Sequence, residues 1–395
     1  MKGIGNMQTN DIEIEVLSKE EKRENRRQRR VRSQRIAYIS LVMAVIILVG
    51  VIVGGGIFVK HQIDEKKQQE MGEQIAESEM EDSVEESINN IDGENIEESN
   101  SEDSVQIEYT PEVVLDEVVE AVISEMTLEE KVAGLFIVTP ESITGVSAAV
   151  QAGEGTKTAL EKYPVGGLIY SGKNIQSEEQ VKKMIENSMT YSKYPLFVAA
   201  DESLAESSQL ASYGINLNFV SIENLAVGNG ATVCIKGFPY GNIDSGEKQN
   251  GLPVINKSLE ELKQAEMIPY INAITNEADM IMIGHMALPQ VAGDNISITM
   301  SKEVISDLLR AELGFNGVVI TDAMNINAIT EYYGADEVAI KAFKAGADMV
   351  LMPENFETAY KGVIAAVQEG TISEDRINDS LKRVFRIKYA DRVVE

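Results

Sequence analysis

Hydrophobic residues form one long run near the start of the chain. Residues 36–59, "IAYISLVMAVIILVGVIVGGGIFV", carry no charged side chain. As a helix they would extend about 36 Å, slightly more than the ~30 Å hydrocarbon core of a bilayer. The run is longer than the apolar part of a cleaved signal peptide, and an arginine-rich segment, "KRENRRQRRVRSQR", lies directly before it. The pattern predicts a signal-anchor helix at 36–59, with residues 1–35 as a basic cytoplasmic tail and the rest of the chain outside the cell membrane.

The next segment is polar and acidic. From Gln68 to Glu130 there is neither Lys nor Arg, and Glu, Asp, Ser and Asn dominate up to about residue 108. Low hydrophobicity combined with one sign of charge cannot bury enough apolar area to offset chain entropy. Residues 60–110 are therefore predicted to be a disordered acidic linker that holds a folded domain away from the bilayer.

Short apolar runs alternate with amphipathic stretches over residues 111–395. The apolar runs are "KVAGLFIV", "VGGLIYS", "PLFVAAD", "INLNFVSI", "ATVCIKGF", "ADMIMIGH", "GVVITDA" and "ADMVLMPE". Among the amphipathic stretches are "SEEQVKKMIENSM", "SLEELKQAEMIPYINAI", "SKEVISDLLRAELG" and "ADEVAIKAFKAG". Eight strands followed by helices predict an α/β fold, a parallel (β/α)8 TIM-type barrel. A doubly wound open sheet is the alternative, but no Gly-rich phosphate fingerprint follows the first strand.

One side of this barrel is predicted to lack part of its helical layer. Only "ENLAVGNG" separates "INLNFVSI" from "ATVCI", whereas a parallel crossover usually needs a dozen or more residues. We therefore expect a barrel trimmed of one or two outer helices. Strands without a covering helix would expose an apolar face, so we also expect a dimer or a protein partner at this trimmed face.

Composition narrows the chemistry. A formal net charge of −29 argues against nucleic acid as a partner. The single cysteine, Cys234, excludes an intramolecular disulfide and a Cys-rich metal site. Only two histidines are present, His61 and His285, and no residues have the spacing of metal ligands. We expect neither a metal nor another cofactor.

Five polar residues follow the predicted strands, and in a barrel the C-terminal ends of the strands carry the functional groups. They are Asp201, Lys236, His285, Asp322 and Glu354. Asp322 is the best candidate because a carboxylate directly after apolar strand residues is costly there unless it is paired or used. The alternative is an N-cap for the segment that follows it. Glu354 is expected to be a surface charge.

Several motifs resemble the family-three glycoside hydrolases, in particular the bacterial β-N-acetylhexosaminidases. They are "ELGFNGVVITDAMNINAI", "GADMVLMP", "VGGLIYSGKNI", "YGINLNF", "GLPVINKSLEEL" and "LKRVFRIKYA", and the resemblance covers about residues 113–390. It implies that Asp322, in the family's "TD" pair, is the nucleophile that forms the glycosyl–enzyme intermediate. It also implies substrate-binding roles for Asp201, Lys236 and His285. Alternatives are an ion pair between Lys236 and Asp322, and a hydrogen-bonded structural role for His285.

The same resemblance implies that the acid/base loop is altered. The family carries "KHFPGHGDT", then an Asp–His dyad within "DSH", then "LGLPV". Aligned without a gap at "GLPV", this chain has Gly237 and Gly241 in place of two histidines, Glu247 in place of the dyad Asp and Gln249 in place of the dyad His. A glutamine amide cannot donate and recover a proton near neutral pH. Glu247 is then the candidate replacement acid.

Two functions from different classes remain open. One is retaining hydrolysis of terminal β-linked N-acetylglucosamine by a membrane-anchored glycosidase, with an amino-sugar glycan or a peptidoglycan fragment as substrate. The other is a catalytically inactive, membrane-tethered protein of the same fold that binds sugar or serves as a scaffold. An unrelated barrel enzyme such as an aldolase is weaker, because the sequence offers no evident Schiff-base lysine or phosphate loop.

Overall fold

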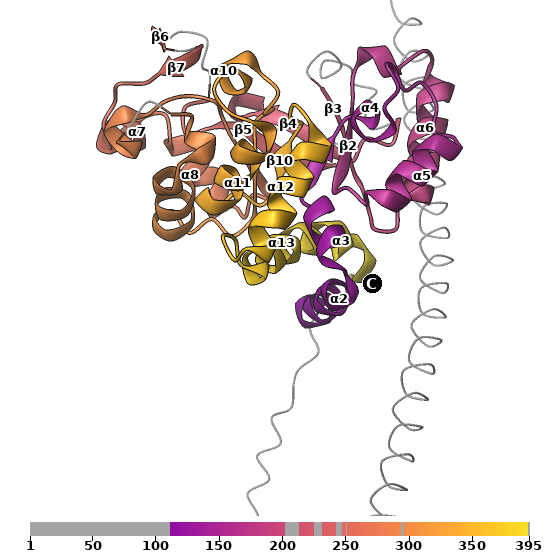
Figure 1. Ribbon diagram of the computed structural model, residues 1–395. Coiled ribbons are helices and arrows are strands. Elements are labelled where there is room, and N and C mark those ends of the chain that lie inside the picture. Colours follow the sequence, from indigo (N-terminus) through magenta and orange to yellow (C-terminus); the bar gives the residue numbers. More distant parts are fainter. Residues whose placement is uncertain are drawn as a thin grey trace, which may run out of the picture. The chain divides into compact units, whose positions relative to one another are not determined.

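Eight parallel strands form one sheet that curves into a nearly closed barrel (Figure 1). The computed structural model describes residues 111–201, 213–224, 231–241, 247–249, 251–293 and 296–393. The sheet order is β10-β1-β2-β3-β4-β5-β8-β9. An isolated parallel bridge between Ile320 and Met349 joins the two edges of the sheet. The strands are β1 (Phe136–Val138), β2 (Gly167–Tyr170), β3 (Phe197–Ala200), β4 (Leu217–Ser221), β5 (Thr232–Phe238), β8 (Met280–Ile283), β9 (Val318–Thr321) and β10 (Val350–Leu351).

Each of the eight apolar runs contains one of these strands. The predicted parallel eight-stranded barrel is therefore confirmed in the number and direction of its strands. The described helices of the barrel domain are α2 (Pro111–Glu125), α3 (Leu128–Ala133), α4 (Pro140–Thr144), α5 (Glu154–Lys162), α6 (Glu178–Tyr191), α7 (Leu259–Gln264), α8 (Ile268–Thr275), α9 (Pro289–Ala292), α10 (Asn327–Thr330), α11 (Ala335–Ala345), α12 (Phe356–Gln368) and α13 (Glu374–Val393). Short 3-10 helices are η1 (Gly172–Asn174), η3 (Ile222–Asn224) and η4 (Ile298–Met300), and η5 (Glu303–Glu312) is a π-helix.

Two predicted helices differ from the structure. The stretch "SLEELKQAEMIPYINAI" forms two helices, α7 and α8, because Pro269 lies in the first turn of α8, where its missing N–H costs nothing, and cannot continue α7. The stretch after Ser301 is the π-helix η5, whose hydrogen bonds are one residue longer than those of an α-helix. A two-stranded antiparallel hairpin, β6 (Glu247–Gln249) and β7 (Leu252–Val254), is an element that the sequence did not predict.

The predicted thin side of the barrel lies at β4 and β5. Leu217–Ser221 pairs residue by residue with Thr232–Lys236, and the described part of their connection contains only the short helix η3. The apolar side chains Phe219, Val220 and Val233 are half-buried there, not exposed. Among the residues that the structure describes, these two strands therefore carry half-buried apolar side chains and no strongly exposed apolar face.

The buried carboxylate of Asp348 lies at the base of the barrel, near the N-terminal ends of β9 and β10. Its Oδ2 accepts from the Val319 N–H at 2.8 Å, and its Oδ1 accepts from the Ser380 hydroxyl at 2.8 Å. The guanidinium groups of Arg310 and Arg383 pair with it. This network ties β9, η5 and α13 together at the point where the sheet closes.

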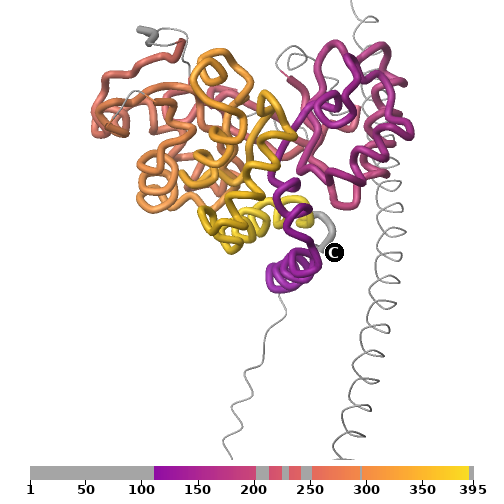
Figure 2. The backbone as a smooth tube through the Cα atoms, in the orientation of Figure 1, coloured from indigo at the N-terminus to yellow at the C-terminus, as the bar shows by residue number. Residues whose placement is uncertain are grey.

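The first and last described helices also meet at the base. Figure 2 shows α2 beside the yellow C-terminal helix α13, and Lys382 pairs with Glu120 at 3.0 Å. The chain therefore enters the barrel at its base, the edge opposite the C-terminal strand ends. Among the helices of the described residues, none has both the length and the apolar character needed to cross a bilayer. The predicted segments 1–35, 36–59 and 60–110 lie outside the described residues and stay predictions.

Candidate active site

Asp322 lies at the C-terminal end of β9, as the sequence predicted for the nucleophile position. Its N–H donates to the Ile283 carbonyl of the neighbouring strand at 3.0 Å. Its half-buried carboxylate accepts, through Oδ1, the N–H of Ala323 at 2.8 Å. No described group donates a hydrogen bond to Oδ2. Among the described residues, one carboxylate oxygen is thus held by the backbone and the other has no hydrogen-bond donor.

Lys236 belongs to the same edge of the barrel. The Cys234 thiol, two residues earlier on β5, has its pKa raised first by complete burial and then by the negative charge of Asp322, while the positive charge of Lys236 opposes the rise. Both charges therefore act on one buried sulfur from the strands around it. Asp201 follows β3, where its N–H donates to the Tyr170 carbonyl at 2.8 Å. Asp201 and Lys236 each make further interactions within the protein.

His285 follows β8 and is buried, with 6% of its surface exposed. Its Nε2 lies 3.0 Å from the Ala323 carbonyl oxygen, and its Nδ1 lies 3.1 Å from the Ser297 hydroxyl. Burial lowers the pKa of the imidazole more than the nearby charge of Asp322 raises it. With both nitrogens engaged inside the protein, the geometry favours the structural alternative for His285 over direct contact with substrate.

In the loop after β5, two positions have backbone conformations that favour glycine. Gly237 has φ +83° and Gly241 has φ +71°, which side-chain-bearing residues rarely adopt. A β-carbon on Gly237 would lie 2.6 Å from the carbonyl oxygen of Gly241. These are the two positions where the resemblance places histidines. Of the altered dyad, Glu247 and Gln249 lie in β6, and their side chains lie outside the described part of the chain.

A second polar network at this edge was missed by the sequence reasoning. The side-chain amide of Asn174, which is fully buried, donates to Glu141 Oε1 at 2.6 Å and to the Ala149 carbonyl at 2.9 Å. Lys173 lies 3.6 Å from the other oxygen of Glu141. The loops that follow β1 and β2 are fixed to each other by these contacts. The run "SGKN" after a predicted strand was the available signal, because Asn and Ser are frequent in such turns.

Met352 is a further residue of this edge that the sequence did not single out. It follows β10 with φ +43°, an uncommon value for a residue with a side chain. Its N–H donates to the Ile137 carbonyl of β1 at 2.8 Å, which fixes the strained residue beside the first strand. Glu354, two residues later, is exposed, as expected of a surface charge.

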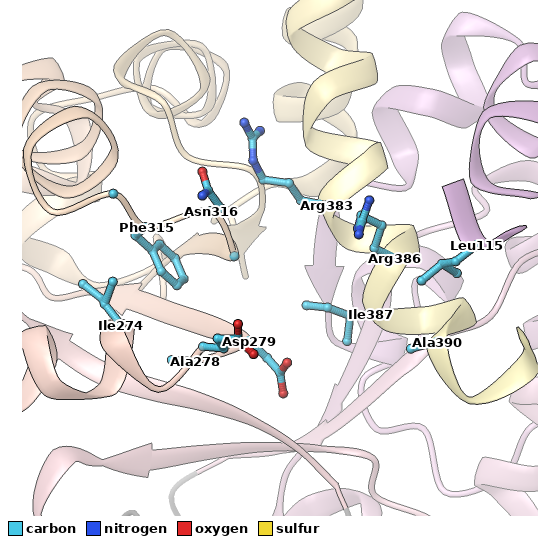
Figure 3. Close-up of a pocket in the computed structure, with 13 residues that line it drawn as sticks. Leu115, Ile274, Ala278, Asp279, Phe315, Asn316, Arg383, Arg386, Ile387 and Ala390 are labelled. Atoms are coloured by element: carbon cyan, nitrogen blue, oxygen red, sulfur yellow. The ribbon is translucent and has the colours of Figure 1, made fainter. Parts of the chain in front are cut away.

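One well-defined hollow lies at the opposite edge of the barrel. It has a volume of about 480 Å³ and is bounded by the N-terminal ends of β8 and β9 together with α2 and α13. Figure 3 shows Asp279 between Ile274 and Phe315 on one wall and Arg383 and Arg386 on α13. Both arginines already pair with carboxylates, Asp348 and Asp116. The hollow lies far from Asp322, and no candidate residue of the strand ends contributes to it.

Comparison with known proteins shows what the barrel is similar to. Residues 225–387 match the family described as "Glycosyl hydrolase family 3 N terminal domain". The part of the barrel from β5 to α13 is thus similar to a family 3 domain. A solved family 3 β-N-acetylglucosaminidase from Paenibacillus sp. str. FPU-7 is 27% identical, with a TM-score of 0.59, covering 68% of this chain and 63% of that one.

Two relatives with curated names match smaller shares of the chain. Beta-hexosaminidase A of Pseudoalteromonas piscicida is 22% identical over 322 residues, which is 58% of this chain and 54% of the relative. Beta-hexosaminidase LpqI of Mycobacterium tuberculosis is 27% identical over 167 residues, covering 40% of this chain and 42% of the relative. The chain thus spans about half of the length of these two relatives. The family 3 match includes β5, β8, β9 and β10, the strands that carry Lys236, His285 and Asp322.

The structure thus places Asp201, Lys236, His285 and Asp322 at or near the C-terminal ends of four strands of one barrel. The charges of Asp322 and Lys236 act in opposite directions on the pKa of the Cys234 thiol, and His285 contacts the residue after Asp322. Among the described residues, no group of three or more His, Cys, Asp or Glu side chains could hold a metal ion. The arrangement offers a half-buried carboxylate, Asp322, at the edge of the barrel that also carries Lys236.

Proposed function

We propose that this family 3 domain is a retaining β-N-acetylhexosaminidase-like glycosidase of low turnover. Its substrate class is a terminal β-linked N-acetylglucosamine on an amino-sugar glycan or peptidoglycan fragment. The observation that carries the proposal is the placement of Asp322, with Oδ1 fixed by the Ala323 N–H and Oδ2 left without a described donor. Relatives and a structural neighbour named as β-hexosaminidases or β-N-acetylglucosaminidases support the choice of sugar.

In the retaining reaction, Asp322 would attack the anomeric carbon and form a covalent glycosyl–enzyme, which water then hydrolyses. Lys236, on β5 at the same edge of the barrel, would bind sugar hydroxyl groups. The leaving oxygen must be protonated, and the dyad histidine that the resemblance implies for this step is Gln249 in this chain. A missing general acid costs about 10²–10⁴-fold in rate, so natural glycosides should turn over slowly and aryl glycosides less so.

Covalent trapping tests this proposal. Incubation with an activated, fluorinated amino-sugar glycoside should add the mass of one glycosyl group to the protein, and peptide mapping should place it on Asp322. Asp322→Asn should abolish the adduct. Glu354→Gln is the matched control, because it makes the same acid-to-amide change at an exposed strand-end residue. An unlabelled parent protein, or equal labelling of Asp322→Asn, would refute Asp322 as the nucleophile.

A second candidate function is glycan binding without hydrolysis. The backbone at Gly237 and Gly241 favours it, because the loop has been rebuilt around glycines where the resemblance places histidines. Titration calorimetry with N-acetylglucosamine disaccharides would then show binding while the ligand is recovered intact. Hydrolysis of the same disaccharides would exclude this alternative.

We further propose that the chain is anchored in the cell membrane by residues 36–59, with its N-terminus in the cytoplasm and the barrel outside. The uncharged run preceded by arginines supports this. Protease added to intact cells should release the barrel by cutting the linker and leave residues 1–35 protected. Protection of the barrel would contradict the assignment.

A dimer or partner contact at the β4–β5 side is the remaining proposal on assembly. It is supported by the short connection between these strands and by the partial exposure of Phe219, Val220 and Val233. Sedimentation of residues 110–395 should show a dimer or concentration-dependent association. A stable monomer at all concentrations would refute it.

A further inference from the structure

The two peptide units that flank Ala323 come directly after Asp322, the candidate nucleophile. Their N–H and carbonyl groups form hydrogen bonds with different kinds of partner. The Ala323 N–H donates to Oδ1 of Asp322 at 2.8 Å. Directly after it, the Met324 N–H donates to the Leu351 carbonyl of β10 at 2.9 Å. Between these two donors lies the Ala323 carbonyl, and it is bound by the imidazole of His285 at 3.0 Å. A side chain, in place of a neighbouring strand, therefore fixes this part of the turn.

The chemistry of the contact determines the tautomer of His285. A carbonyl oxygen can only accept, so Nε2 must carry the proton. The neutral ring then accepts at Nδ1 from a hydroxyl, and two are present: Ser297 Oγ at 3.1 Å and Thr299 Oγ1 at 3.3 Å. These hydroxyls also share a hydrogen bond with each other at 2.9 Å, and both side chains are buried. The pair accommodates the tautomer that the Ala323 carbonyl requires, because a hydroxyl can donate to Nδ1.

We propose that His285 is a positioning residue for Asp322. It acts through Ala323 and holds the turn so that Asp322 keeps one oxygen on the Ala323 N–H and presents the other to the sugar. Ser297 and Thr299 support it by donating to Nδ1, which holds the ring in place. The inference rests on the proposed function, because a positioning role has a kinetic meaning only if Asp322 is the nucleophile.

The first experiment does not depend on catalysis. The chain has only two histidines, His61 and His285, so their ring nitrogens can be distinguished by NMR of labelled protein with His61→Gln as the assignment control. His285 should show the Nε2–H tautomer and should not titrate between pH 5 and 8, since the ring is buried between its three partners. An ordinary titration of His285, or the Nδ1–H tautomer, would overturn the proposal even in a protein without activity.

The second experiment measures the rate of covalent labelling. His285→Leu removes the donor, whereas His285→Gln can place an amide N–H near the position of Nε2 and serves as the conservative rescue. Misplacement of a reacting group by about 1 Å costs roughly 100-fold. We expect His285→Leu to slow the maximal labelling rate about 100-fold, while the reagent concentration that gives half of that rate changes less than about threefold. His285→Gln should recover most of the rate.

Folding and function can be separated in the same series. If His285→Leu does not fold, Ser297→Ala combined with Thr299→Val removes the Nδ1 donors and should slow labelling in the same direction. Equal labelling rates for the parent and a folded His285→Leu would refute the positioning role, as would a His285→Gln variant as slow as His285→Leu. Absence of labelling in the parent would instead refute the proposed function, and the NMR result would still stand on its own.

Discussion

Substitution of Gly237 by alanine should destabilise the domain strongly, and the structure allows the cost to be estimated in two parts. At φ +83°, a residue with a β-carbon costs about 1–2 kcal/mol relative to glycine. The new β-carbon would also lie 2.6 Å from the Gly241 carbonyl oxygen, well inside the ~3.3 Å at which a carbon and a carbonyl oxygen normally meet. Because that oxygen belongs to the backbone, relief requires the loop to move, at a further cost of about 1–3 kcal/mol.

Gly145→Ala is the matched control. Gly145 also has a positive φ, +72°, but a β-carbon there would meet nothing within 4 Å. Both substitutions restrict the unfolded chain equally, so their difference isolates the contact with Gly241. Urea denaturation of residues 107–395 should show Gly237→Ala to be less stable than Gly145→Ala by about 1–3 kcal/mol. Equal stabilities would refute the close approach.

Three further predictions concern the base, the altered dyad and pH. Asp348→Asn should lower the free energy of unfolding by about 3–5 kcal/mol, because it breaks a buried ion pair, whereas Ser380→Ala should lower it by about 1 kcal/mol. Similar losses for the two variants in a denaturant titration would contradict the central role of the charge. Glu247→Asp with Gln249→His should raise hydrolysis of a natural disaccharide more than that of a nitrophenyl glycoside, since only the natural leaving group needs protonation; an equal gain on both would count against a restored acid. Burial alone would raise the pKa of Glu141, but hydrogen bonds from Ala149 and Asn174 outweigh burial and lower the pKa below 4.5. The stability that Glu141 contributes should therefore be present above pH 4.5 and be lost as the pH falls through the lower folded pKa. In a Glu141→Gln variant the free energy of unfolding should depend less on pH, and an unchanged pH profile would exclude this source.

The amino-acid sequence by itself determined the strands of the barrel. Parallel strands in a barrel are buried on both faces, so they read as continuous apolar runs, and each of the eight runs contains a strand. It also placed Asp322 and Lys236 at one edge, because the C-terminal ends of parallel strands lie together. The local helix ends were readable as well: Thr127 with Glu130, and Ser258 with Glu261, form capping boxes at α3 and α7.

Only the tertiary structure decided what these residues do to one another. The imidazole of His285 meets Ser297 and Ala323, which lie 12 and 38 residues further along the chain, and no local pattern encodes that meeting. The same holds for Asp348, whose partners lie on η5, β9 and α13. From the sequence, Gly237 is only a glycine at a position where the resemblance places a histidine, whereas the fold brings the Gly241 carbonyl against it. Hydrophobic period and turn chemistry are local properties, whereas the tautomer of a buried ring and the room for a β-carbon depend on segments that only folding brings into contact.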